Sequence, residues 1–168
     1  MFRRIVIFFS FTFLLSQTPD WDCDGDGLLD NLNEYANSGS FTVGVLLDGI
    51  NMSSEGDMFA AFIDDEIRGI GTLSLVPDVV PVFGEWAGQY QFAILIYSNE
   101  ASGEFVNFKY YDSETDSVYD IDDTYEFISD MTEGNAVSPI VFNYNSLNIT
   151  IDDYDICGEE CLSGTYDC

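Results

Sequence analysis

Apolar and polar residues alternate with a period of two along much of the chain between residues 40 and 145. Phe41–Leu47, Val106–Tyr110 and Ile140–Tyr144 each place apolar side chains at every second position, with polar or small residues at most of the positions between them. A period of two puts every second side chain on the same face of a β-strand. The pattern therefore predicts strands with one buried face.

Two segments depart from simple alternation. Tyr90–Tyr97 is apolar at nearly every position, which is typical of a central strand covered on both faces. Phe59–Ile63 and Ile67–Leu75 are separated by the short acidic segment Asp64–Glu66. This spacing predicts a β-hairpin.

Acidic segments divide the later part of this region. Asp112–Asp116 and Asp122–Asp123 interrupt the apolar pattern between residues 105 and 128, and we expect both to be turns between strands. No helical periodicity of comparable length occurs there. About eight strands at this spacing predict an all-β fold, an antiparallel β-sandwich over residues 38–146.

The N-terminus has the composition of a processing signal. Arg3 and Arg4 precede an apolar run from Ile5 to Leu15, the arrangement of a signal peptide, and this run is too short to span a bilayer. We expect residues 1–17 to be removed and the mature chain, without a membrane span, to be secreted or held at the cell surface. A membrane anchor or a buried strand is the alternative for this segment.

The chain is strongly acidic. It has 31 Asp and Glu against four Lys and Arg, no histidine, and a formal net charge of −27. Nucleic-acid binding needs clustered basic residues, so that partner is excluded, and so are catalysis by histidine and His-ligated metals. Beyond residue 17 only Arg68 and Lys109 are basic, and we expect Arg68 to pair with an acid such as Asp57 or Glu66 rather than to bind an anionic ligand.

One group of acids has the spacing of metal ligands. Counted from Asp22, carboxylates occupy positions 1, 3, 5 and 9 of a loop, and Gly27 stands at position 6, where the chain must turn. Calcium takes six to eight oxygen ligands, and an EF-hand loop supplies them at these positions. The expected ligands are Asp22, Asp24, Asp26, Leu28 through its carbonyl, Asp30, and Asn33 or Glu34 at the closing position. An acidic linker without a metal is the alternative.

Residues 20–34 resemble the Asp-x-Asp-Gly-Asp-Gly-x-x-Asp repeats of dockerins and of thrombospondin type 3 proteins. This resemblance implies Ca²⁺ as the cofactor of an EF-hand-like segment over residues 18–37. Only one such loop is present, which disfavours a dockerin that binds a cohesin. The apolar residues between Leu28 and Tyr35 predict a short helix after the loop.

Residues 38–145 resemble a β-sandwich module of exported and cell-surface bacterial proteins. The residues that carry the likeness are Gly56–Ile63, Asp64–Gly71, Ile94–Asn99 and Phe108–Asp112, together with Ser102–Glu104. The resemblance implies the fold and a surface setting, and it implies no particular activity.

Four cysteines follow the predicted signal peptide: Cys23, Cys157, Cys161 and Cys168. Three of them lie in an acidic tail over residues 147–168. Exported chains fold in oxidising compartments, so disulfides are expected, although the spacing leaves every pairing open. A thiolate zinc site is the less favoured alternative, because the surrounding acids oppose thiolate formation.

These features together predict a non-catalytic, calcium-binding module with a role in adhesion, glycan binding or as a structural spacer. Its expected partners are calcium and either a glycan or another surface protein. A glycan would stack on exposed aromatic side chains, and the candidates are Trp21, Trp86, Tyr97, Tyr111 and Tyr119. The alternative is a glycoside hydrolase that uses two carboxylates, or its carbohydrate-binding accessory domain.

Overall fold

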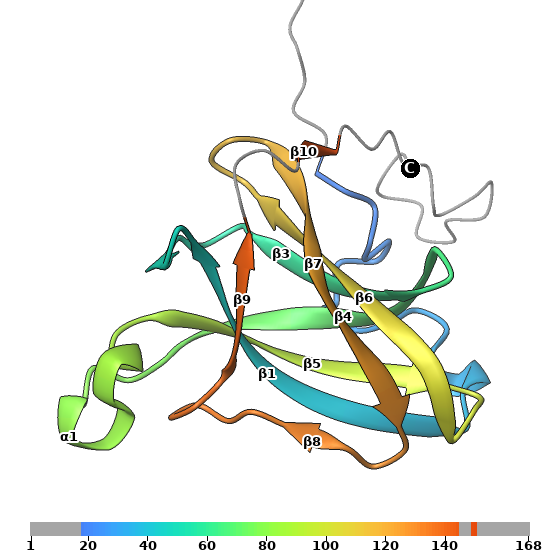
Figure 1. Cartoon of the computed structure of the whole chain (residues 1–168). Helices are drawn as coiled ribbons and strands as arrows, with labels where there is room; N and C mark the ends of the chain where they lie inside the picture. The colour runs from blue at the N-terminus through green and yellow to red at the C-terminus, as the bar shows by residue number, and fades with distance from the viewer. Residues whose placement is uncertain (1–17, 145–148, 151–168) are drawn as a thin grey trace, which may run out of the picture.

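The computed structural model describes residues 18–144 and 149–150 (Figure 1). The short helices are η1 (Leu32–Glu34), α1 (Val80–Phe83) and η2 (Gly84–Trp86). The strands are β1 (Asn37–Leu47), β2 (Ile50–Asn51), β3 (Met58–Ile63), β4 (Glu66–Leu75), β5 (Tyr90–Ser98), β6 (Ser102–Asp112), β7 (Ser117–Ile128), β8 (Thr132–Glu133), β9 (Ile140–Tyr144) and β10 (Ile149–Thr150).

The described strands form one sheet in the order β10-β7-β6-β3-β4-β5-β1-β2, and β8 and β9 also pair with β1. Neighbouring strands run antiparallel, except that β1 pairs in parallel with β8 and β9. The sheet curls, so that β7 and β9 approach each other on one side of β1 (Figure 1). The prediction of an all-β fold built mainly from antiparallel strands is confirmed.

Strand β4 joins the two halves of this sheet. Its first residues pair with β3, and its last residues, from Gly71 to Leu75, pair with β5. The hydrogen bonds therefore trace one continuous curled sheet where the sequence predicted a sandwich of two sheets. Gly69 allows the strands to approach closely here, because an added Cβ would lie 2.3 Å from the carbonyl oxygen of Leu95.

The turns between strands follow the predictions in two places and depart from them in one. The turn expected at Asp112–Asp116 is present, since β6 ends at Asp112 and β7 begins at Ser117. The β3–β4 hairpin is present, and its turn residues Asp64 and Asp65 both have positive φ, 50° and 67°, as a two-residue type I′ turn requires. The turn expected at Asp122–Asp123 is wrong, since β7 continues through both residues. Both side chains are exposed, so the strand continues without burying either charge.

Aromatic side chains fill the inner, concave face of the sheet. The rings of Phe108 and Phe142 lie 4.9 Å apart between centroids, and Phe59 stacks on Phe108 at 5.5 Å. The fully buried members of this cluster include Phe41, Phe59, Phe92, Phe108, Tyr110, Phe127 and Phe142. They come from strands across the whole curl, so the alternating pattern of the sequence builds one core.

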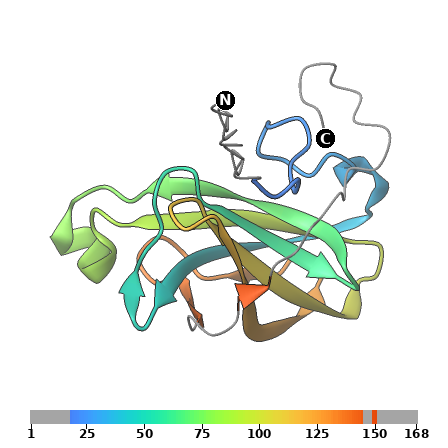
Figure 2. The ribbon, with the colours of Figure 1, turned by 90° about the horizontal axis from the view of Figure 1, so that it is seen from above.

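A second apolar cluster lies on the outer face of β3, β4 and β6, where the N-terminal segment covers it. Trp21 and Leu29 are only 3% and 7% exposed. They belong to one cluster with Phe62 and Ile67, and the ring of Trp21 meets that of Phe62 edge to face at 5.8 Å. Figure 2 shows the segment that precedes β1 lying outside the sheet, on the side away from β7 and β9.

The strand buried on both faces is therefore β3, and the prediction for Tyr90–Tyr97 is wrong in this respect. Strand β5 is central in the sheet, and Ile94 and Ile96 face the core, but Leu95 on its outer face is 47% exposed. The physical reason is that Trp21 and Leu29 cover β3, β4 and β6 and leave β5 open.

Two predicted segments lie outside the described residues, namely the signal peptide over residues 1–17 and most of the tail over residues 147–168. Within the described ranges, no helix combines the length and the apolar composition needed to cross a bilayer.

Candidate metal-binding loop and adjoining groove

The acidic loop lies between the two anchor residues of the outer face, Trp21 and Leu29. The carboxylates of Asp22, Asp24 and Asp30 each bring one oxygen within 4.8 Å of the others. These residues occupy positions 1, 3 and 9 of the predicted ligand pattern. The fold thus brings together three of the carboxylates that the spacing selected.

Asp22 organises the backbone of the loop. Its carboxylate accepts hydrogen bonds from the backbone N–H groups of Gly25 and Gly27, both at 2.8 Å. The two glycines have φ of 73° and 79°, a conformation that glycine adopts without steric cost. The sharp turn predicted from glycine at position 6 is therefore present, and it closes around the first carboxylate.

The other predicted ligands are placed less favourably. Asp26 accepts a hydrogen bond from the N–H of Leu28 at 2.8 Å, and its carboxylate is not a member of the three-oxygen group. Asn33 and Glu34 are exposed residues of η1, and Glu34 does not join the group either. The helix expected after the loop is reduced to the single 3₁₀ turn of η1.

The pKa of one carboxyl group in the loop is shifted. Burial, followed by the nearby charge of Asp24, raises the pKa of Asp30, with smaller contributions in the same direction from Asp22 and Asp26. A backbone hydrogen bond from Cys23 opposes the rise. The raised pKa means that the negative charge of this carboxylate is not balanced by a nearby positive charge. A divalent cation at this position would supply that positive charge.

A polar network fixes the chain between the loop and β1. The hydroxyl of Tyr35 donates to Glu66 at 2.7 Å and accepts from Asn31 at 3.3 Å, and burial together with the bond to Glu66 raises the pKa of Tyr35. The guanidinium of Arg68 lies 4.7 Å from the centroid of the Tyr35 ring and pairs with Glu66 at 3.0 Å. Arg68 thus takes a structural role between the loop segment and β4.

Cys23, inside the loop, is disulfide-bonded. The other candidates, Cys157, Cys161 and Cys168, lie outside the described residues. A disulfide at Cys23 stabilises the fold by restricting the conformations of the unfolded chain.

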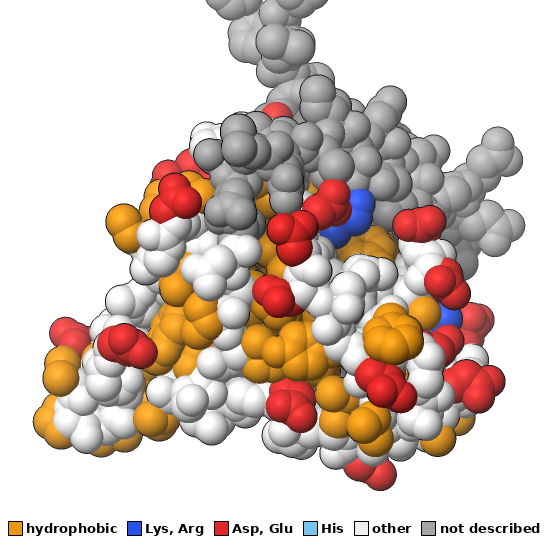
Figure 3. Space-filling view, viewed as in Figure 1, with side chains coloured by type: hydrophobic (Ala, Val, Ile, Leu, Met, Phe, Trp, Pro, Cys, Tyr) orange, Lys and Arg blue, Asp and Glu red, His pale blue; other side chains and the backbone are white. Residues whose placement is uncertain are grey.

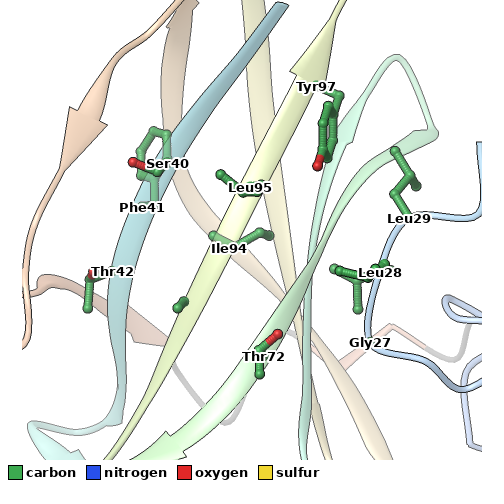
Figure 4. Close-up of a pocket in the computed structure, with 12 residues that line it drawn as sticks. Gly27, Leu28, Leu29, Ser40, Phe41, Thr42, Thr72, Ile94, Leu95 and Tyr97 are labelled. Atoms are coloured by element: carbon green, nitrogen blue, oxygen red, sulfur yellow. The ribbon is translucent and has the colours of Figure 1, made fainter. Parts of the chain in front are cut away.

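A groove of about 310 Å³ lies beside the loop (Figure 4). Its floor is the outer face of β1, β4 and β5, where Thr72 and Leu95 are exposed and Thr42 is half-buried. Leu28 and Leu29 of the loop form a wall. The described residues that line the groove include no charged side chain. The groove is therefore suited to apolar contact.

The aromatic residues proposed for glycan stacking are mostly in the cores. Trp21, Trp86, Tyr111 and Tyr119 are each at most 6% exposed. Tyr97 is half-buried, and its ring lies 6.3 Å from that of Tyr35. Over the described part of the chain, these five residues do not form a row on an open sheet face.

One carboxylate that the sequence analysis did not identify as buried is that of Asp57. Asp57 is 6% exposed and accepts hydrogen bonds from the N–H of Ser54 at 2.7 Å, the hydroxyl of Tyr110 at 2.6 Å, and both the N–H and the hydroxyl of Ser113, at 2.9 and 2.8 Å. It joins the segment before β3 to the turn after β6. No local pattern marks this carboxylate, because Tyr110 and Ser113 lie 53 and 56 positions away in the sequence.

The fold and this site define a small β domain with an anchored acidic loop on its outer face. No protein-family model, no curated protein and no solved structure matches the chain.

Proposed function

We propose that this chain is a non-catalytic, calcium-binding structural module of a secreted or cell-surface protein. The observation that carries the proposal is the convergence of Asp22, Asp24 and Asp30 in a loop whose two ends are anchored on the sheet. A cation that neutralises these acids would remove the repulsion that now opposes closing the loop.

The ligand set would include more than the three converged carboxylates. Calcium requires six to eight oxygens, so Asp26, the carbonyl of Leu28, and Asn33 or Glu34 complete the set in this proposal, together with water. Asp26 and Glu34 would have to turn toward the metal. We expect the affinity to be modest, because the closing residue does not join the carboxylate group.

A structural role has more support than glycan binding or hydrolysis. Four of the five aromatic candidates are buried, and a sugar platform needs exposed rings. The described lining of the groove holds no carboxylate, whereas glycoside hydrolysis needs two around a bound sugar. What remains is a domain with a buried inner core and a second apolar cluster on part of its outer face, which fits a spacer or an adhesive module.

Export and an oxidising environment complete the proposal. The apolar N-terminal run resembles a signal peptide, and the disulfide at Cys23 is the chemistry of oxidising compartments. In a calcium-rich exterior the loop would be occupied, and dissolved salt would screen the remaining acids.

Calorimetric titration with CaCl₂, together with thermal unfolding in CaCl₂ and in EDTA, tests this proposal. We expect heat of binding and a melting temperature that rises with calcium. Both effects should be lost in a variant carrying Asp22→Asn and Asp24→Asn, because two of the three converged carboxylates are removed.

The matched control carries Asp64→Asn and Asp65→Asn in the β3–β4 turn. It removes the same charge from exposed residues outside the acidic loop, and asparagine tolerates the positive φ found there. We expect it to bind calcium as the unsubstituted chain does. Equal loss of binding in both variants, or no binding by the unsubstituted chain, would contradict the proposal.

A further inference from the structure

The outer edge of β7 (Ser117–Ile128) has few partners in the described part of the chain. One edge of this strand pairs with β6 along its length, whereas on the other edge only Val118 and Tyr119 pair, with β10. No described strand pairs with residues 123–128 on that side, and no ladder joins β7 to the nearby β9 (Figure 1). An edge of this kind presents backbone N–H and C=O groups to which another strand can add.

The inner face of β7 is packed, so the edge is held in an extended conformation. Phe127 is fully buried. The ring of Tyr125 lies 5.4 Å from that of Phe41 and 5.9 Å from that of Phe142. Glu126 stands between the two packed residues of β7 and is exposed. The strand is therefore preformed, and a segment that adds to it has to order only itself.

Acidic side chains crowd the chain along and after this edge. Residues 120–133 include six acids and no basic residue, namely Asp120, Asp122, Asp123, Glu126, Asp130 and Glu133. Burial raises the pKa of Tyr125, and the charges of Asp123 and Glu133 add to the rise. Figure 3 shows Asp and Glu side chains at several places on the face that β7 and β9 present. The edge therefore lies in a negative field.

The basic side chains of the described chain are engaged elsewhere. Arg68 pairs with Glu66 at 3.0 Å, and Lys109 pairs with Asp120 at 3.5 Å. Within the described ranges, no ion pair involves the acids of residues 123–133. Beyond residue 17 the chain has no other basic residue. The positive charge that would neutralise this edge therefore has to come from a partner or from dissolved ions.

The charge of the edge decides between a second copy of this chain and a different partner. A second copy would bring the same acids to the contact, and like charges opposite each other across a strand pair are destabilising. Charged side chains on an edge strand prevent pairing between identical edges in this way. A basic strand would gain the same backbone hydrogen bonds and would place opposite charges beside the acids.

We propose that residues 123–128 of β7 bind an extended, basic segment of another protein, which adds to the sheet as a further strand. Backbone hydrogen bonds supply affinity in this mode of recognition, and side chains at alternate positions supply specificity. Lys or Arg at every second position of the segment would therefore lie on one face, beside Glu126 and the neighbouring acids. This proposal goes beyond the proposed function and does not rest on calcium binding.

Fluorescence anisotropy with a labelled peptide of four Lys-Thr repeats tests the binding. Lys then recurs at every second position, and Thr between them favours an extended strand. The measurement is made in EDTA, so that calcium at the acidic loop plays no part. We expect saturable binding that weakens as NaCl is added. Hydrogen exchange measured by NMR locates the peptide, and we expect slower exchange of amides within residues 123–128 and no change in β5.

Charge reversal at the edge should weaken the binding. A variant with Asp123→Lys and Glu126→Lys should bind the peptide at least about tenfold more weakly, because opposite charges across the contact become like charges. The matched control carries Glu55→Lys and Glu85→Lys, at exposed positions outside β7. It changes the net charge by the same amount and should lose much less affinity. If the first variant melts at a lower temperature, Asp123→Asn with Glu126→Gln replaces it.

A second control separates strand addition from attraction by charge alone. The same peptide with every backbone nitrogen methylated keeps its Lys side chains and has no backbone N–H to donate. We expect it to bind at least about tenfold more weakly than the unmethylated peptide and to protect no amide of β7.

The proposal is overturned if the unmethylated peptide does not bind, or if the methylated peptide binds equally well, which indicates attraction by charge alone. It is also overturned if the two double variants lose affinity equally, or if the slowed amides lie outside β7. None of these outcomes depends on calcium binding by the loop, so the two proposals fail independently.

Discussion

The outer face of the sheet is covered in one half and open in the other. Over β3, β4 and β6, Trp21 and Leu29 cover Phe62 and Ile67. Over β1 and β5, Leu95 remains exposed in a groove. The inner face packs into one core across the sheet, so the difference arises from a short N-terminal segment that lies outside this core. A segment of this kind can decide which strand is buried on both faces, whatever the place of that strand in the sheet.

Removing the cover should have the largest effect. Truncating a buried tryptophan costs about 3–5 kcal/mol, so Trp21→Ala should lower the free energy of unfolding by about that amount. Urea unfolding followed by circular dichroism measures it. Trp21→Phe keeps most of the packing and should cost clearly less, especially as the indole N–H of Trp21 has no hydrogen-bond partner to lose. A loss below 1 kcal/mol for Trp21→Ala would show that the segment does not stabilise the covered half.

Calcium should stabilise the covered half by a smaller amount. At free calcium one hundred times above Kd, linkage gives about 2.7 kcal/mol, and EDTA should remove it. Hydrogen exchange locates the effect. We expect slower exchange in residues 21–35 and in β3 and β4 when calcium is present, and no change in β9. A uniform change over the whole sheet would contradict a local role for the loop.

Asp30→Asn should change stability in opposite directions with and without calcium. The pKa of Asp30 is raised in the folded state, so without metal its protonation stabilises the fold below pH 4, and this contribution is lost as pH rises through the folded pKa. At pH 7 in EDTA the variant should therefore melt at a higher temperature than the unsubstituted chain. In CaCl₂ it should melt at a lower temperature, because a ligand is missing. The same sign in both buffers would contradict the assignment of Asp30 as a ligand.

The smallest effect is expected on the open half. Leu95→Ala removes a side chain that is 47% exposed and leaves no cavity in the core, so the free energy of unfolding should fall by less than about 1 kcal/mol. Ile94→Ala, one residue earlier and 2% exposed on the inner face, is the control and should cost about 2–5 kcal/mol. Similar losses for the two variants would mean that the outer face of β5 is covered after all.

Local patterns were sufficient for much of the fold. Alternation in Phe41–Leu47 and Ile140–Tyr144 placed strands correctly, and Asp64–Glu66 predicted the β3–β4 hairpin, because a two-residue turn depends on residues adjacent in sequence. The acids at Asp122–Asp123 were misread as a turn. Nothing local distinguishes a turn from an exposed stretch of strand, and the pairing of β7 with β6 decides it.

The candidate site shows the same division. The spacing of Asp22, Asp24 and Asp30 was readable because loop ligands lie close together in the chain. The closing position at Asn33 or Glu34 was open in the sequence and is not filled by a converged carboxylate in the structure. No sequence pattern predicted the groove. Its residues come from the loop and from β1, β4 and β5, which are neighbours in the sheet but not consecutive in the sequence.

The sequence alone determined the all-β class, the strongly acidic character, the exclusion of histidine chemistry and the spacing of the loop acids. Each of these depends on composition or on residues within a few positions of one another. Only the tertiary structure decided that β4 joins both halves of the sheet, that Trp21 and Leu29 cover β3 instead of β5, and that Asp57 is buried with four hydrogen bonds. These features depend on contacts between distant segments, and such contacts arise when the whole chain packs around one core.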